Sequence, residues 1–115
     1  MSEAAIKKEL NRIKKAIITH LRNADYKIIR CTNDPVCAIG ARENEWRCIV
    51  GHLRSISHEI VKELESLPCP DHRIIKKEIW LRNKGEVQFY KLLWDPGKHA
   101  WVDQFGEVIR FKPDS

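Results

Sequence analysis

Two residues of this chain have the type and placement to support chemistry, Asp34 and His52. Asp34 precedes Pro35 and the apolar segment Val36–Ala41, and His52 lies near the end of a second apolar segment, Trp46–Leu53. A carboxylate is a preferred ligand of Mg²⁺, and an imidazole can bind a metal or transfer a proton near neutral pH. Brought together, they could form part of a site for metal-assisted hydrolysis.

Each of these residues also has a common structural role. An aspartate before proline is more often a turn residue than a ligand, so Asp34 on its own is weak support for a metal site. A histidine such as His52, on a mostly apolar strand, more often forms a hydrogen bond at the strand end. We expect the four tryptophans to pack in the core or at sheet edges rather than to stack on bases: Trp46, Trp80, Trp94 and Trp101.

Hydrophobic periodicity predicts the elements that position these side chains. Apolar residues at spacings of three and four predict a helix over Ala4–Asn23, and a second helix is expected between the N-cap Ser57 and Pro68. Strands are predicted at Tyr26–Cys31, Val36–Ala41, Trp46–Leu53, Arg73–Arg82, Glu86–Trp94, Ala100–Val102 and Glu107–Phe111. The second helix is a crossover between the third and fourth of these strands, which are therefore expected to be parallel within a mixed sheet.

The hairpin between the second and third strands sets the geometry of the candidate site. Pairing about a Glu43–Glu45 turn places Val36 near His52 and Cys37 near Gly51. The aspartate before the hairpin and this histidine are then expected to approach each other at one end of it.

This order of elements resembles the PD-(D/E)xK nuclease superfamily, the restriction-endonuclease-like fold, over roughly Ala4 to Trp94. In that family a basic helix precedes a strand, an Asp opens the next strand, and a hairpin delivers a carboxylate and a lysine two residues apart. Asp34 matches the family's Asp, and Cys48–His52 matches the acid-x-lysine strand. The resemblance implies an α/β fold, an α+β mixed sheet, with the order α-β-β-β-α-β-β and extra C-terminal strands.

The chain departs from the family pattern where the chemistry would lie. His52 takes the lysine position, and Val50 takes the position of the acid. The resemblance thus implies degenerate catalytic positions at Asp34 and His52, a weak metal site at Asp34, and Mg²⁺ as cofactor only if activity remains. Glu9 and Glu59, on the two predicted helices, are the acids that could replace the missing one.

Length, charge and cysteine usage limit the classes of function. The 115 residues fit one domain, 1–115, with a frayed tail at 112–115. The formal net charge of +5 favours an anionic partner, of which nucleic acid is the commonest. No apolar run approaches the ~20 residues of a membrane span, so a cytoplasmic protein without membrane contact is expected. The cysteines form no C-x-x-C pair and are interpreted as reduced core residues: Cys31, Cys37, Cys48 and Cys69.

The sequence therefore predicts a nucleic-acid-binding protein on a degenerate PD-(D/E)xK scaffold with weak or no hydrolytic activity. The partner is expected to be DNA rather than RNA, and a homodimer is compatible with the chain. Two alternatives stay open, an active metal-dependent endonuclease with a rearranged site and a protein–protein interaction subunit. The residues expected to contact phosphate, if they are not simply solvated, are Lys7, Lys8, Arg12, Lys14, Lys15 and Arg54.

Overall fold

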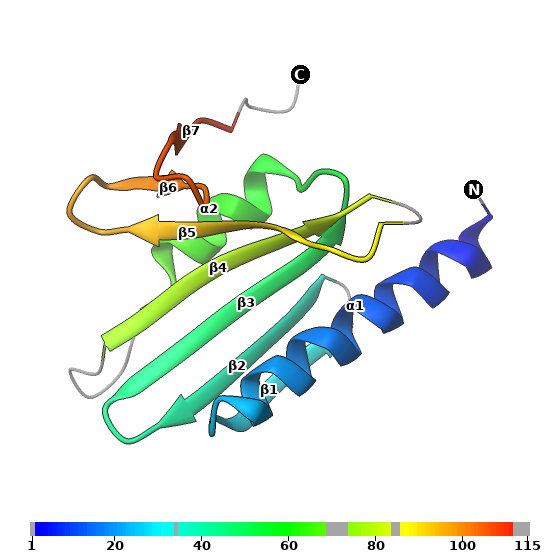
Figure 1. The fold of residues 1–115 in the computed structure, drawn as a ribbon, viewed down its shortest axis with the longest axis horizontal. Helices are drawn as coiled ribbons and strands as arrows, with labels where there is room; N and C mark the ends of the chain where they lie inside the picture. The colour runs from blue at the N-terminus through cyan, green and yellow to red at the C-terminus, as the bar shows by residue number, and fades with distance from the viewer. Residues whose placement is uncertain (1, 34, 69–73, 84–85, 112–115) are drawn as a thin grey trace.

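The computed structural model describes residues 2–33, 35–68, 74–83 and 86–111. It is an α+β fold with a mixed seven-stranded sheet and two helices (Figure 1). The elements, in chain order, are α1 (Glu3–Asn23), β1 (Lys27–Asn33), β2 (Val36–Arg42), β3 (Glu45–Leu53), α2 (His58–Ser66), β4 (Ile74–Arg82), β5 (Tyr90–Asp95), β6 (Ala100–Val102) and β7 (Val108–Ile109). Within the described ranges, no helix is long and apolar enough to cross a membrane.

Helix α1 covers one face of the sheet and packs on β1, β2 and β3. It begins where the Ser2 hydroxyl accepts a hydrogen bond from the backbone N–H of Ala5, at 3.2 Å. Ile13, Ile17 and Leu21 follow at spacings of four, and all three are fully buried against the sheet. The predicted amphipathic helix is thus confirmed.

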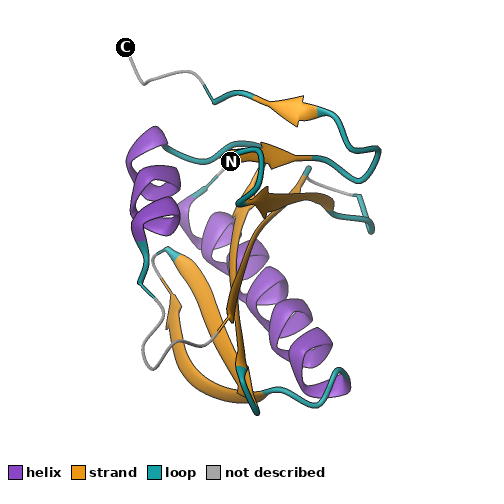
Figure 2. Cartoon of the chain, turned by 90° about the vertical axis from the view of Figure 1, so that its left-hand side faces the viewer, coloured by secondary structure: helices purple, strands orange, loops and turns teal. Residues whose placement is uncertain are grey.

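Helix α2 covers the opposite face, so the sheet lies between the two helices (Figure 2). Ser57 is the N-cap, as expected, and its hydroxyl accepts a hydrogen bond from the backbone N–H of Ile60 at 3.3 Å. Val61 and Leu64 are buried in the apolar cluster on this side, together with Val50 of β3. The strands between the helices are apolar on both faces because each face is covered by a helix.

The strands lie in the sheet in the order of the chain. Strand β3 is antiparallel to β2 and parallel to β4, and the β3–β4 register runs from Glu45 opposite Ile74 to Leu53 opposite Arg82. The predicted crossover geometry is therefore confirmed. The antiparallel pairing of β4 with β5 is much shorter than that of β4 with β3.

The predicted register of the β2–β3 hairpin is wrong by one residue. Val36 pairs with Gly51 and not with His52. The last pair before the turn is Arg42 with Glu45, so the turn contains two residues and not three. Every predicted pair in this hairpin is displaced by one residue in consequence.

Several predicted boundaries also change, and strand β1 spans Lys27–Asn33 rather than Tyr26–Cys31. Strand β5 begins at Tyr90 rather than at Glu86, and Val87 before it is 87% exposed. Strand β7 is shorter than predicted. The predicted turn at Asn83–Gly85 lies partly outside the described residues, and the predicted tail at 112–115 lies wholly outside them.

The close packing of α1 on β3 depends on Gly51. A Cβ atom at this position would lie 2.5 Å from Ile13 Cγ2 and 2.7 Å from Ile17 Cδ1, well inside van der Waals contact. We expect Gly51→Ala to lower the free energy of unfolding by about 1–3 kcal/mol, measured by denaturant titration. Gly97→Ala is the control, because the nearest atom there is Asp95 Oδ1 at 3.3 Å. Equal effects of the two substitutions would contradict this account.

Candidate functional site

The positions matched to the nuclease motif form no described metal site. Asp34, the predicted catalytic and metal-binding residue, lies outside the described residues. Val50, at the expected acid position, is 4% exposed and packs in the apolar cluster beneath α2. His52 is partly buried, and its Nδ1–H donates to the backbone carbonyl of Leu53 at 3.0 Å. The histidine thus has the strand-end hydrogen bond expected of its ordinary structural role.

A hollow of about 350 Å³ lies beside Val50, between the β1–β3 part of the sheet and α2. Its walls are mostly apolar, and Glu63 is the carboxylate among its described lining residues. Glu9 does not fill the gap, because it lies on α1, over the other face, and pairs with Arg82 at 3.0 Å and Arg12 at 2.7 Å. No group of three His, Cys, Asp or Glu side chains is placed to hold a metal in the described part of the chain.

The predicted phosphate-binding residues of α1 differ in their contacts. The Lys14 ammonium donates to Asn33 Oδ1 at 2.6 Å, beside the β1–β2 connection. Arg12 is paired with Glu9 on another side of the helix. The remaining predicted residues are exposed and form no ion pair with a described residue: Lys7, Lys8, Lys15 and Arg54.

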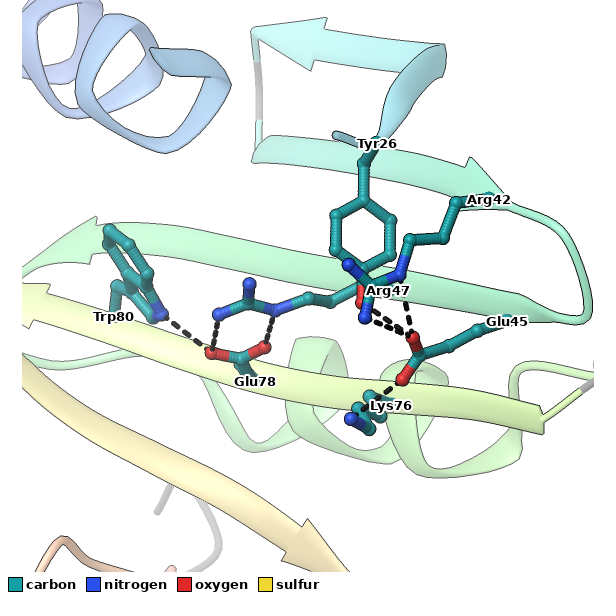
Figure 3. Close-up of polar contacts among 7 residues, drawn as sticks. All are labelled: Tyr26, Arg42, Glu45, Arg47, Lys76, Glu78 and Trp80. Carbon is teal, nitrogen blue, oxygen red and sulfur yellow. Dashed lines mark hydrogen bonds and ion pairs between the residues drawn. The ribbon is translucent and has the colours of Figure 1, made fainter. Parts of the chain in front are cut away.

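A charged network that the sequence interpretation missed lies on β3 and β4, on the α1 face of the sheet (Figure 3). Glu45 and Arg47 alternate on β3, and Lys76 and Glu78 alternate on β4. The register places Arg47 opposite Lys76, which would set two like charges side by side. Each cation is instead paired with the carboxylate diagonally across the strands.

The Arg47–Glu78 pair is the buried half of this network. Both ends of the guanidinium fork engage the carboxylate, with Nη2 at 2.8 Å from Oε1. The indole N–H of Trp80 donates to the same oxygen at 3.2 Å, and Glu78 is 3% exposed. The hydrogen bond to Glu78 raises the pKa of Arg47, so this side chain is a permanently charged and fixed cation.

Glu45 is the centre of the other half. Its carboxylate accepts hydrogen bonds from the Lys76 ammonium at 2.6 Å, the Tyr26 hydroxyl at 2.7 Å and the Arg42 guanidinium at 3.2 Å. The bond from Lys76, followed by that from Tyr26, lowers the pKa of Glu45 to about 2. The carboxylate therefore stays ionised and holds the side chains of Lys76 and Arg42 in place.

These cations surround a hollow of about 730 Å³ in the fork between β4 and β5. The β4–β5 pairing extends only from Leu81–Tyr90 to Glu78–Leu93, beyond which the two strands diverge (Figure 1). We call this space the basic hollow and define it by four lining cations: Arg42, Arg47, Lys76 and Lys91. Lys77 also lines the hollow, but its ammonium donates to the backbone carbonyl of Glu65 in α2 at 2.6 Å.

The basic hollow carries a local excess of positive charge. Its four cations face two carboxylates, Glu45 and Glu78, which leaves two positive charges unbalanced. Lys91 forms no ion pair with any residue described, and its ammonium lies 4.0 Å from the centre of the Trp80 ring. Burial lowers the pKa of nearby His20, and the positive charges of Arg47 and Lys91 lower it further.

The sequence did contain a signal for this network. On both strands, charges of opposite sign occupy alternate positions, and both strands also carry buried apolar residues. Because alternate residues share a face, this pattern indicates a row of charged side chains on one face of a sheet. In the sequence, however, Arg47 only interrupts an apolar segment, and Lys76 is only one member of a charged stretch. Their convergence required the β3–β4 register, which periodicity alone does not provide.

Comparison of the chain with protein-family models, with curated proteins and with solved structures gave no significant match. The function is therefore argued from the geometry and charge of the site.

The pKa of Glu45 leads to a test by pH. The pKa is about 2 in the folded protein against 4.5 for an unperturbed glutamate, so the ionised carboxylate stabilises the fold fully above about pH 4.5. This stabilisation is lost as the pH falls toward 2. We expect Glu45→Gln to unfold more easily than wild type at pH 6 and the difference to vanish near pH 2, measured by urea titration.

Glu43→Gln, in the exposed turn beside Glu45, is the matched control and should follow the wild-type curve throughout. A stability difference between Glu45→Gln and wild type that did not change between pH 6 and pH 2 would contradict the account.

Proposed function

We propose that this chain is a nucleic-acid-binding protein built on a degenerate PD-(D/E)xK nuclease scaffold, with little or no hydrolytic activity. The observation that carries the proposal is the basic hollow, where cations from β2, β3, β4 and β5 converge with an excess of two positive charges. A polyanion in the fork can meet several of these cations at once.

The side chains of the basic hollow suit phosphate binding in two ways. The side chains of Lys76 and Arg42 are 58% and 46% exposed, so phosphate oxygens can reach them without a rearrangement of the core. Glu45 and Glu78 limit the motion of their cationic partners, which reduces the entropy lost when a ligand binds. Neutralising phosphates also releases condensed counterions, which gives affinity without sequence specificity.

The scaffold part of the proposal rests on element order. A helix, an antiparallel hairpin, a crossover helix and a strand parallel to the second hairpin strand agree with the family resemblance. The expected loss of hydrolysis rests on Val50, which provides no oxygen ligand and is surrounded by apolar side chains. Mg²⁺ at such a site would lack the second carboxylate that it usually has.

Salt-dependent binding tests the proposal. We expect the protein to bind duplex or branched DNA, with an affinity that falls as salt rises, in fluorescence anisotropy titrations at several salt concentrations. Lys76→Gln combined with Lys91→Gln should weaken binding and should make the salt dependence shallower, by about 0.9 in log–log slope for each phosphate that the variant no longer neutralises. The same titrations with single-stranded DNA and RNA define the preferred partner.

A matched variant separates the basic hollow from the predicted surface of α1. Lys8→Gln combined with Lys15→Gln removes the same charge from exposed positions of α1 and should leave binding nearly unchanged. If the α1 double variant lost more affinity than the Lys76→Gln, Lys91→Gln double variant, the interface would lie on α1 and not at the basic hollow. Absence of salt-sensitive binding to any nucleic acid would overturn the proposal and favour an interaction subunit.

A cleavage assay tests the second half of the proposal. In the presence of Mg²⁺ or Mn²⁺, the purified protein should cleave its bound DNA slowly or not at all. Gel electrophoresis of the DNA measures the cleavage. Rapid metal-dependent cleavage that disappears in Asp34→Ala would show that an active endonuclease has assembled its site without an acid at Val50.

A further inference from the structure

Two cysteines lie side by side across the β2–β3 hairpin. Cys37 pairs with Val50 and Cys48 pairs with Ile39, so the two cysteines are diagonal neighbours on the α2 face of the sheet. Their sulfur atoms are 3.6 Å apart. The expectation that the cysteines are core residues holds for Cys48, which is 1% exposed, whereas Cys37 is partly exposed and Cys31 is exposed. Cys69 lies outside the described residues.

The two thiols differ in access. Both cysteines line the hollow of about 350 Å³ beneath α2, but Cys48 is buried and Cys37 is partly exposed. Arg30 of β1 lines the same hollow and places a positive charge near Cys37. A reagent that enters this hollow therefore meets Cys37 before Cys48.

The two thiols also differ in reactivity. The hydrogen bond between the sulfurs lowers the pKa of Cys37; burial opposes this shift, and the charge of Arg30 adds to it. The same hydrogen bond, followed by burial, raises the pKa of Cys48. Because the thiolate is the nucleophile, Cys37 is the thiol that attacks, and Cys48 is the thiol that follows.

We propose that Cys37 and Cys48 form a reversible dithiol–disulfide pair, in which Cys37 reacts with a small disulfide such as oxidised glutathione and Cys48 completes the bond. The site needs no residue of the basic hollow, so it stands independently of the proposed nucleic-acid binding.

The exchange balances in two steps. The Cys37 thiolate attacks one sulfur of oxidised glutathione, the glutathione S–S bond breaks, and one glutathione leaves as a thiolate that takes up a proton. Cys48 then loses its proton and attacks the Cys37 sulfur, which expels the second glutathione. The two protein thiols lose two electrons, and one glutathione disulfide is reduced to two thiols.

The geometry makes the bond reversible. A disulfide requires about 2.05 Å between the sulfurs, so β2 and β3 must adjust before the bond can close. Diagonal neighbours in an antiparallel pair are about 7–8 Å apart at Cα, above the usual range of about 4.4–6.8 Å for a disulfide. A bond formed under such strain is more easily reduced than a relaxed structural disulfide.

The test uses the full chain with Cys31→Ser and Cys69→Ser, which leaves two thiols. After treatment with oxidised glutathione and alkylation of the remaining thiols, trypsin should yield peptides 31–42 and 48–54 joined by a disulfide, detected by mass spectrometry and released by dithiothreitol. Adding Cys48→Ser should stop the reaction with one glutathione on Cys37. Adding Cys37→Ser should leave Cys48 unmodified under the same treatment.

Wild-type protein treated in parallel shows whether the serine substitutions disturb the fold, because the same two peptides should be joined in it through Cys37, which fragment ions distinguish from Cys31 in peptide 31–42. Two results would overturn the proposal. One is glutathione on Cys48 in the Cys37→Ser variant, at a rate similar to that on Cys37 in the Cys48→Ser variant. The other is the absence of the joined peptides in wild-type protein whose exposed Cys31 is fully glutathionylated, since that modification shows that the reagent has reacted.

Discussion

The parallel pairing of β3 with β4 is the constraint on which the rest of the structure depends. It extends along the whole of β3, and the crossover through α2 sets its register. Because side chains alternate along each strand, this one register sends Cys48, Val50 and Ile79 toward α2. It sends Ile49 and Trp80 toward α1, with the charged network on the same face. A shift of one residue would place charges in both apolar clusters.

The same pairing explains why the positive charge gathers where it does. Helix α1 ends at Asn23, so it covers β1 to β3 and leaves the start of β4 accessible. There the alternating charges of the two central strands are stable because each cation has a carboxylate beside it. Strand β5, which pairs with β4 at Trp80–Lys91, then adds Lys91 without a matching acid among the described residues. The excess charge is therefore a product of topology and not of a run of basic residues.

More of the fold than of the candidate site could be predicted from the sequence. The amphipathic stripe of α1, the N-cap at Ser57 and the crossover each depend on short-range patterns, and these predictions are confirmed. The hairpin register failed because a turn of two residues and one of three cannot be told apart in Glu43–Glu45. The basic hollow combines residues from β2 to β5, whose proximity depends on that long-range pairing. The lysines of α1, by contrast, are close in sequence and can be identified without any long-range pairing.

The short ladder between β4 and β5 also gives the protein an uneven local stability. Strands β5, β6 and β7 are held to the central sheet by that ladder and by packing such as that of Trp101, whose indole N–H donates to Glu65 of α2 at 3.0 Å. Few backbone hydrogen bonds and limited burial lower the free energy of local opening, so backbone amides in β6 and β7 should exchange with solvent before those of β3. The β5 wall of the fork thus joins the slowly exchanging centre of the sheet to its rapidly exchanging edge, and a ligand bound between β4 and β5 would couple the two.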